Sequence, residues 1–429
     1  MKILYRYILS ETLSFFAVSI FASTAILLTL RMLHFAALIV DKGVEFNQIL
    51  HIFIAIIPTF MEVALPLTTL LAVMLAFARF SGDSEVIVMR TSGVSLYQLL
   101  TPVIIFGAAA SLAGLLLAHR LKPWGYQKLA RTLFEIARTK STSGLEEGIF
   151  NKLGPLTLYA EEIDDASGGL KRVLIDDRRD KEARKIITAK AGSILSDEER
   201  RSITLHLQDG VIHEIIDSKY VLTSFTANSV ALSPDELFDP ANKRQGKQPN
   251  EMTAAELRET LAYYRTLDFH APPGTVIAPE SFSEPRPRWL VAEPLTPESL
   301  NRKVIRLKLE MGQRYSLPFA SLALALLALP LGIQPPRTQR TWGAGIAVTL
   351  GMSVFILYYG LFSIGLVLAQ NNRLHPLLAL WIPNLSVFLL ALYLIRKTAS
   401  EEWQSIAHAF EQALQYTAVR LKLDKVAPP

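Results

Sequence analysis

The sequence contains no cysteine among its 429 residues, which excludes disulfides, thiolate metal sites and thiol nucleophiles. It is also poor in charge, because only 19 % of its residues are charged, against about a quarter in soluble proteins. An apolar content of 50 %, with only 22 Gly and 23 Pro, excludes collagen-like and disordered chains. Together with a mean hydropathy of +0.28, this composition predicts several membrane spans joined to one ordinary soluble part.

Signatures of common enzyme classes are missing too. No segment matches a P-loop, since Gly246-Lys247 is followed by Gln248 and lacks the upstream glycine. Neither H-E-x-x-H nor G-x-S-x-G occurs, and the eight histidines are scattered. No soluble basic stretch is interleaved with aromatic residues, which argues against nucleic-acid binding. The sequence therefore predicts a protein that is no enzyme, uses no metal or other cofactor, and takes no energy from an ATP site of its own.

Six apolar runs are long enough to cross a bilayer core of about 30 Å. The predicted spans are Leu13–Leu30 with a continuation to Val40, Ile49–Phe80, Leu99–Ala118, Tyr315–Leu331, Trp342–Ala369 and Leu374–Ile395. The first run is longer than the apolar core of a signal peptide, so we interpret it as a retained helix. A long insertion after the third span gives a three-plus-three arrangement.

The cations in the short loops predict the orientation. The side of the two termini carries Lys2, Arg6, Arg79, Arg90, Arg337, Arg340, Arg396 and Lys397, whereas the opposite short loops carry Arg31, Lys42 and Arg373. We therefore expect cytoplasmic termini and an insertion outside, which is the periplasm in a bacterium with two membranes.

The insertion is predicted to be mainly β-structure. Short runs, several of them alternating, are Leu156–Ala160, Val173–Asp176, Lys185–Lys190, Ser202–Leu207, Val211–Ile215 and Tyr220–Ala227. Turn signals, including Asp209-Gly210, separate them and favour a sandwich, barrel or jelly roll. Thr253 and Glu256 form a capping box before a helix, residues 271–297 form a proline-rich linker, and Thr296-Pro297 begins a helix into the fourth span.

The loop between the second and third spans predicts a short helix. Ser81 to Ser84 supply candidate N-caps, and Asp83 and Glu85 favour a helix N-terminus. Val86, Ile87 and Met89 then offer an apolar face, and Gly93 suits the stop.

This loop carries a resemblance to a known family. Residues 65–95 read LPLTTLLAVMLAFARFSGDSEVIVMRTSGVS, and the fourth span is framed by Arg314-Tyr315-Ser316-Leu317-Pro318 and Leu329-Pro330-Leu331-Gly332. These segments, the 3+3 spans and the β insertion resemble the LptF/LptG permeases. The runs Val40–Val44 and Tyr97–Leu100 are more similar to the F type, whereas 271–297 resembles an insertion.

The resemblance implies a membrane subunit of an ABC complex that extracts lipopolysaccharide from the inner membrane of a Gram-negative bacterium. A second six-span permease would complete the cavity, a cytoplasmic LptB ATPase dimer would drive it, and LptC and LptA would receive the lipid. The implied fold is an α-helical membrane protein with six transmembrane helices (3+3) and an inserted periplasmic β-jelly-roll domain. Expected boundaries are 1–120 for spans one to three, 121–300 for the periplasmic part with its linker at 250–300, 301–397 for the last spans and 398–429 for a cytoplasmic amphipathic tail.

Three groups of candidate site residues follow. Basic residues expected to contact the lipopolysaccharide headgroup are Arg31, His34, Lys42, Lys122, Arg131 and Arg306. Snorkelling to the interface also explains the first three, and a solvated juxtamembrane face also explains the last three. Glu62 lies deep in the second span, where it either pairs with a cation or is protonated and satisfied by backbone freed at Pro66. Residues expected to couple the chain to the ATPase are Ser84, Glu85, Val86, Met89, Arg90 and Gly93.

Two other functions remain open at this point. A secondary transporter of a small solute usually has internal repeats and several buried ionisable groups, of which Glu62 alone is obvious. A non-transporting scaffold with a β sensor domain is the third possibility. Copurification with an ATPase and a second six-span chain would favour the exporter. Copurification with no other protein, together with uptake driven by a solute gradient, would favour the secondary transporter.

Overall fold

A computed structural model describes most of the chain. The described residues are 1–42, 46–142, 146–153, 156–164, 169–179, 185–197, 202–216, 219–232, 247–267, 287, 289–290, 295–333 and 344–400. The chain divides into two compact units. The first is Met1–Leu30, Ile57–Lys122 and Asn301–Pro429, and the second is Arg31–Ile56 and Pro123–Leu300. Each unit is described by itself.

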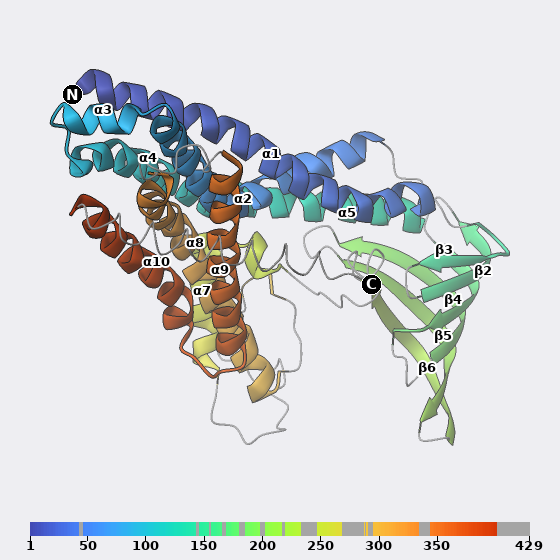
Figure 1. The fold of residues 1–429 in the computed structure, drawn as a ribbon. Coiled ribbons are helices and arrows are strands. Elements are labelled where there is room, and N and C mark those ends of the chain that lie inside the picture. The colour runs from blue at the N-terminus through green and yellow to red at the C-terminus, as the bar shows by residue number, and fades with distance from the viewer. Residues whose placement is uncertain are drawn as a thin grey trace, which may run out of the picture. The chain divides into compact units, whose positions relative to one another are not determined.

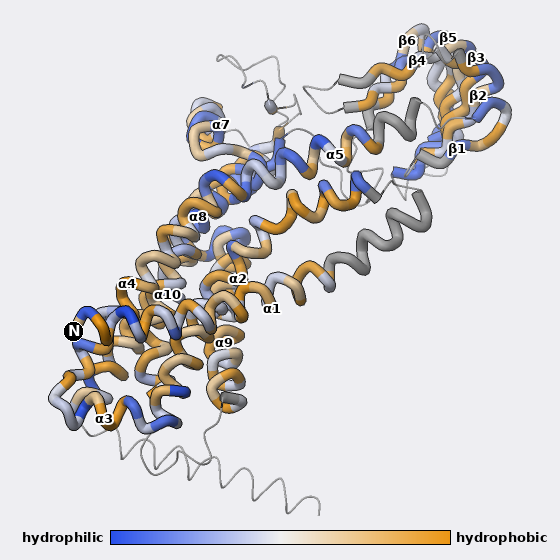
Figure 2. The backbone as a smooth tube through the Cα atoms, turned by 90° about the horizontal axis from the view of Figure 1, so that it is seen from above, coloured by the Kyte–Doolittle hydropathy of each residue, from blue (hydrophilic) through white to orange (hydrophobic). Residues whose placement is uncertain are grey.

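Long apolar helices dominate the first unit. They are the larger parts of α1 (Lys2–Lys42), α2 (Phe46–Gly82) and α8 (Pro297–Gly332), and all of α4 (Leu96–Leu116), α9 (Ala344–Gln370) and α10 (Pro376–Ala399). The short α3 (Glu85–Thr91) lies between α2 and α4 in the sequence. Six helical stretches in the described chain are long and apolar enough to cross a membrane. The predicted 3+3 spans are confirmed, and Figure 2 shows the hydrophobic colour along them.

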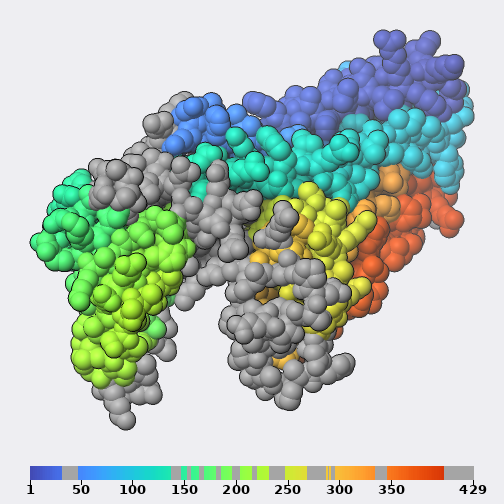
Figure 3. Space-filling view, turned by 180° about the vertical axis from the view of Figure 1, so that it is seen from behind, coloured from blue at the N-terminus to red at the C-terminus, as the bar shows by residue number. Residues whose placement is uncertain are grey.

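The helices α2 and α8 form the centre of this unit. In each of them 78 % of the most apolar 18-residue window is buried, whereas no residue of the corresponding α1 window is. Figure 3 shows α1, in dark blue, at the surface. Glycines let α4 approach α8, since a Cβ at Gly107 would lie 3.0 Å from Ala325 Cβ and one at Gly114 3.2 Å from Pro318 Cβ. Small residues at such crossings are typical of membrane helix pairs.

Four of these helices contain a break in the regular hydrogen-bond ladder, among them α4 with Pro102 and α10 with Pro383. Pro58 and Pro66 lie inside α2, and Pro318 and Pro330 lie inside α8, where each proline lacks the N–H that would bond four residues back. The helix α4 passes through one π turn, η1 (Leu117–Leu121), before it continues as α5 (Lys122–Thr142). The helical continuation after Ala118 was not anticipated from the sequence.

The second unit contains a six-stranded antiparallel sheet in which each strand pairs with its neighbour in sequence, in the order β1 to β6. Figure 1 shows it as one curved sheet. The strands are β1 (Phe150–Leu153), β2 (Leu156–Asp164), β3 (Gly169–Asp177), β4 (Lys185–Asp197), β5 (Ser202–Ile216) and β6 (Lys219–Leu232). The predicted insertion of β-structure between helices is confirmed, and β1 is an addition to it. Leu156, Leu158, Leu205 and Leu207 of the sheet pack with Phe134 of α5 in one core.

One turn prediction was wrong. The pair Asp209-Gly210 lies inside β5, so the two predicted strands 202–207 and 211–215 are one. Asp209 has φ +51°, a left-handed conformation that aspartate tolerates better than most residues, and the ladder resumes on both sides of it. Arg172 of β3 also has φ +51°. Both residues are left out of the pairing with the neighbouring strands, and they lie on the same row across the sheet. A turn signal can therefore mark a local irregularity within a strand.

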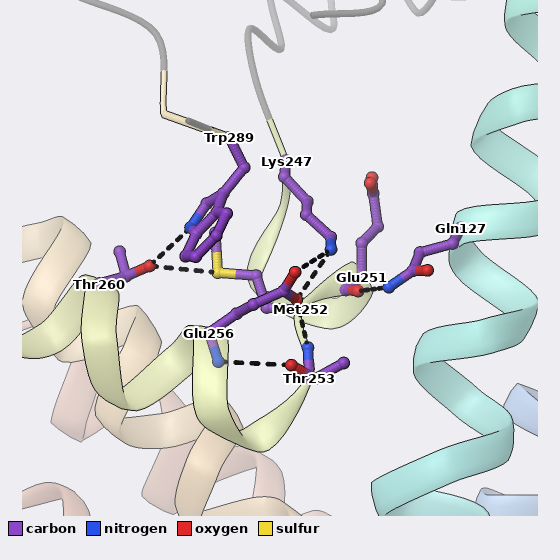
Figure 4. Close-up of polar contacts among 8 residues, drawn as sticks. All are labelled: Gln127, Lys247, Glu251, Met252, Thr253, Glu256, Thr260 and Trp289. Carbon is purple, nitrogen blue, oxygen red and sulfur yellow. Dashed lines mark hydrogen bonds and ion pairs between the residues drawn. The ribbon is translucent and has the colours of Figure 1, made fainter. Parts of the chain in front are cut away.

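A short helical segment follows the sheet in the second unit. Here η2 (Pro249–Glu251) precedes α7 (Ala254–Thr266), and the predicted capping box is confirmed because Thr253 Oγ1 accepts from Glu256 N at 3.3 Å. Figure 4 shows that Lys247 also binds the Glu256 carboxylate and that Trp289 donates to Thr260. The predicted start of α8 at Thr296-Pro297 is confirmed as well, whereas most of the proline-rich stretch lies outside the described residues.

Candidate functional site

The loop between α2 and α4 folds as the short helix α3 that its sequence predicts. Ser84 takes the N-cap position with φ +61° but makes no side-chain cap bond. At the other end Gly93 has φ +88°, and its N–H donates to the Arg90 carbonyl at 3.0 Å. Val94 N donates to the Met89 carbonyl at 3.0 Å, so the end has a glycine-based C-cap. Val86 is buried, which fixes one face of α3 on the helical core.

Polar contacts join this end of α2 and α3 to α1. The Tyr7 hydroxyl donates to Glu85 Oε1 at 3.1 Å and Oε2 at 3.0 Å. Arg79 pairs with Glu11 of α1, and its Nε lies 3.4 Å from Asp83 Oδ2. These bonds hold α3 at a defined position while leaving its outer face open.

That outer face borders a shallow groove. Its volume is about 430 Å³, and its lining residues are Arg90, Thr91, Gly93, Val94, Ser95, Leu96, Tyr97 and Ala399. Beside it Val88 is 61 % exposed and Tyr97 is 56 % exposed. An exposed aliphatic and an exposed aromatic residue around a groove, with the cation Arg90, are suited to contact with another protein.

A second site lies among the spanning helices, where four charged side chains meet. Lys122 Nζ lies 3.0 Å from Glu62 Oε2 and 3.1 Å from Glu310 Oε1. Arg314 Nε donates to the same Glu310 oxygen at 3.1 Å. None of the four side chains is more than 7 % exposed. Two cations and two anions therefore neutralise one another in a setting where an isolated charge would be costly.

Glu62 thus pairs with a cation, which was one of its two expected environments. Its second oxygen, Oε1, has no hydrogen-bond partner within the described residues. Lys122, which we expected at the lipid headgroup, has its charge taken up by two carboxylates. Arg314 was noted only as part of the motif at the fourth span, and its pairing with Glu310 was not predicted, although a spacing of four residues on one helix indicates a possible ion pair.

The other expected headgroup residues are placed only in part. Arg31, His34 and Lys42 belong to α1, but their side chains lie outside the described residues, as do residues 401–429 of the expected amphipathic tail. Arg131 is exposed on α5, and Arg306 is exposed on α8. Within the described residues no group of His, Asp and Glu side chains could hold a metal ion.

A polar network also lies next to the ion cluster on α8. Asn384 Nδ2 donates to the Ser316 carbonyl at 2.8 Å, and Ser316 Oγ donates to the Leu380 carbonyl at 2.7 Å. Tyr358 donates to Asn384 Oδ1 at 2.8 Å. The side chains of Ser316, Asn384 and Tyr358 are all buried, so this network fixes the contacts of α8 with α9 and α10.

Comparison with known proteins adds an independent finding. The family model described as lipopolysaccharide export system permease LptF/LptG matches residues 6–397. The lipopolysaccharide export system permease protein LptF of Escherichia coli K12 is 21 % identical over 400 residues, which cover 91 % of this chain and 94 % of that protein. An uncharacterised protein of Rickettsia prowazekii is 23 % identical over 260 residues, 59 % of this chain and 71 % of that protein.

Proposed function

The chain belongs to the LptF/LptG family of lipopolysaccharide export permeases, and from that premise we propose that it is the F-type membrane subunit of an ABC complex that extracts lipopolysaccharide. Membership makes it a permease component rather than an enzyme, and a multi-pass inner-membrane protein. The observation that carries the proposal is the family match across nearly the whole chain together with six spanning helices around an inserted sheet.

The proposed energy source is an LptB dimer in the cytoplasm, which contacts α3 and the groove beside it. The support is geometric. The capped helix α3 is anchored to α1 through Glu85 and Tyr7, contributes Arg90 to the lining of an open groove, and exposes Val88. A short helix held rigidly against two long ones is suited to transmit movement of a partner into α2 and α4. Ser84, Val86, Met89 and Gly93 would shape and position this coupling helix.

A second six-span permease is the proposed neighbour within the membrane. The most apolar 18-residue window of α1 contains no buried residue, and most of the corresponding window of α9 is not buried, so that side chains such as Phe21 and Leu357 are exposed. In a bilayer such faces contact either lipid acyl chains or another helix, and a lipid-binding cavity within the membrane requires both kinds of contact. Arg31, His34, Lys42, Arg131 and Arg306 are the proposed cations for the phosphates and acidic sugars of the headgroup. LptC and LptA would receive the lipid on the periplasmic side.

Reconstitution tests the function directly. Proteoliposomes that contain this chain, its proposed permease partner and LptB should release lipopolysaccharide to a soluble acceptor in an ATP-dependent manner. Omission of this chain, with the other components unchanged, is the matched control. ATP-independent uptake of a small solute by this chain alone would favour the secondary transporter instead.

The proposed orientation has its own test, which the absence of native cysteine makes simple. Leu195 of β4 is 55 % exposed and Val88 of α3 is 61 % exposed. A membrane-impermeant maleimide added to spheroplasts should label Leu195→Cys, because the sheet is proposed to lie in the periplasm. Val88→Cys should react only after lysis. The reverse pattern would place the termini outside.

A further inference from the structure

The ion cluster has an internal order that points to a role beyond charge neutralisation. Glu310 and Arg314 form a pair within α8, and Glu62 and Lys122 form a pair between α2 and the start of α5. Each pair is neutral by itself. Lys122 and Glu310 join the two pairs at 3.1 Å. Since each pair is neutral without the other, charge balance does not require the contact between Lys122 and Glu310, and that contact serves to tie α2 to α8.

Each helix that contributes to the cluster is also interrupted next to it. Pro66 removes the hydrogen bond to the Glu62 carbonyl, and Pro318 removes the bond to the Arg314 carbonyl. The π turn η1 ends at Leu121, directly before Lys122. Prolines and π turns are the usual sites of helix bending, and π turns occur often at functional positions. All three helices therefore have a break within about one turn of a cluster residue.

The part of α8 beyond its break is held firmly. Ser111 of α4 donates to the Pro318 carbonyl at 2.8 Å. A Cβ at Gly114 would lie 3.3 Å from Pro318 Cα, so α4 and α8 touch backbone to backbone there. Bending at Pro318 would consequently displace the first half of α8, which carries Glu310 and Arg314, while the second half stays with α4.

From this arrangement we propose that Lys122 is a positioning residue for lipid export: it ties the cluster segments of α2, α5 and the first half of α8 together so that they move jointly about the adjacent breaks. This role rests on the proposed function, because it concerns the movement that exports the lipid. The ammonium group suits it, because it reaches two carboxylates on different helices at once.

The decisive variant removes the α8 pair without leaving a buried charge alone. Glu310→Gln/Arg314→Gln deletes one anion and one cation, so Lys122 stays paired with Glu62 but loses its ion pair with α8 and retains at most a neutral hydrogen bond there. Lipopolysaccharide released per ATP hydrolysed should fall about tenfold, a typical size for lost coupling between sites. Lys122→Arg, which retains the charge and adds donors, should stay near the wild-type ratio. Glu162→Gln/Lys171→Gln removes an exposed ion pair of the sheet and is the matched control, expected to change nothing.

A distance measurement tests the same idea without any partner protein. Leu116 at the end of α4 and Arg302 near the start of α8 are both exposed, and the chain has no other cysteine to block. Spin labels on Leu116→Cys and Arg302→Cys should give a narrow distance distribution in the purified permease. The Glu310→Gln/Arg314→Gln background should broaden it, and Lys122→Arg should not.

The outcomes separate the two proposals. If the wild-type complex exports no lipid but the label distances broaden as expected, the proposed function fails and the mechanical link stands. If the double variant exports at the wild-type ratio with a narrow distribution, Lys122 is not a positioning residue; direct headgroup binding by Lys122 predicts this result, since the variant retains that side chain. A second double variant, Glu62→Gln/Lys122→Gln, removes the other pair of the cluster and keeps the test valid if the first variant fails to fold. Loss of folding in both would assign the cluster to folding and overturn the positioning role.

Discussion

The hydroxyl of Tyr7 donates to both carboxylate oxygens of Glu85, at 3.1 and 3.0 Å, and so binds α1 to α3, the proposed coupling helix. Tyr7 also packs on Phe80, with the two ring centroids 5.4 Å apart. Glu85 is therefore oriented from within its own chain, with a carboxylate that still accepts further donors. A basic residue of the ATPase could complete its environment.

Replacement of Glu85 should uncouple the proposed complex. Glu85→Ala is expected to weaken ATPase binding or to separate ATP hydrolysis from export, because losing one partner of a buried interfacial charge pair costs about 2–5 kcal/mol. Lipid crosslinking to the isolated permease should be largely unchanged. Copurification of LptB and lipid release per ATP measure the two effects.

The control for that experiment is Tyr7→Phe, which retains the ring packing and removes only the internal hydrogen bond. Its effect should be no more than about 0.5–1.5 kcal/mol, the usual net value of one hydrogen bond. Glu85→Ala and Glu85→Lys complexes that assemble and export at the wild-type rate would show that α3 is not the coupling element.

Arg31 should matter more for lipid binding than Lys42. Arg31 lies within an apolar run, where a cation is costly unless it has an anionic partner, and a lipopolysaccharide phosphate could supply one. Arg31→Glu is expected to weaken lipid crosslinking and export more than Lys42→Glu does. Equal crosslinking and export in the Arg31→Glu variant and the wild type would remove this residue from the headgroup site.

Tyr358→Phe should destabilise the helical unit. The substitution removes the donor to Asn384 Oδ1 and leaves that oxygen buried without it, which costs about 1–3 kcal/mol. Denaturation by SDS in detergent micelles measures the loss. Tyr97→Phe alters an exposed tyrosine and should leave the transition in place. Identical transitions for all three proteins would mean that the Asn384 network is dispensable.

The capping box of α7 predicts a pH dependence in the second unit. Partial burial raises the pKa of Glu256, but hydrogen bonds from Lys247 and Thr253 outweigh it and hold the pKa below its usual range. A carboxyl whose folded pKa is depressed stabilises the fold above its unfolded pKa of about 4.3, and the contribution is lost as pH falls through the folded value. Amide exchange of α7, corrected for intrinsic rates, should therefore lose protection below about pH 4.

Glu256→Gln provides the comparison, because glutamine retains a side-chain oxygen for the cap but does not ionise in this range. Its α7 protection should be lower at neutral pH and should not change as the solution is acidified. A wild-type helix whose protection is constant down to pH 3 would contradict the assignment.

Local patterns were sufficient for much of the architecture. Apolar runs of sufficient length determined the six spans, since a bilayer requires about 20 consecutive apolar residues in a helix. The end of α3 at Gly93 and the capping box of Thr253 and Glu256 were predictable from segments of four or five residues, because capping is a contact between near neighbours in the chain. The alternation around Ile203 to Leu207 likewise predicted a half-buried strand.

Only the tertiary structure decided which distant residues meet. Glu62, Lys122 and Glu310 are widely separated in sequence, and nothing local to Lys122 distinguishes a buried cation from one that snorkels to the interface. Asp209-Gly210 has the composition of a turn, yet β5 continues through it as a local irregularity, because the strand pairs with β4 and β6 on both sides of Asp209. Short-range periodicity therefore determined the elements of this protein, and the packing of helices far apart in the chain determined its ion cluster and the anchoring of α3.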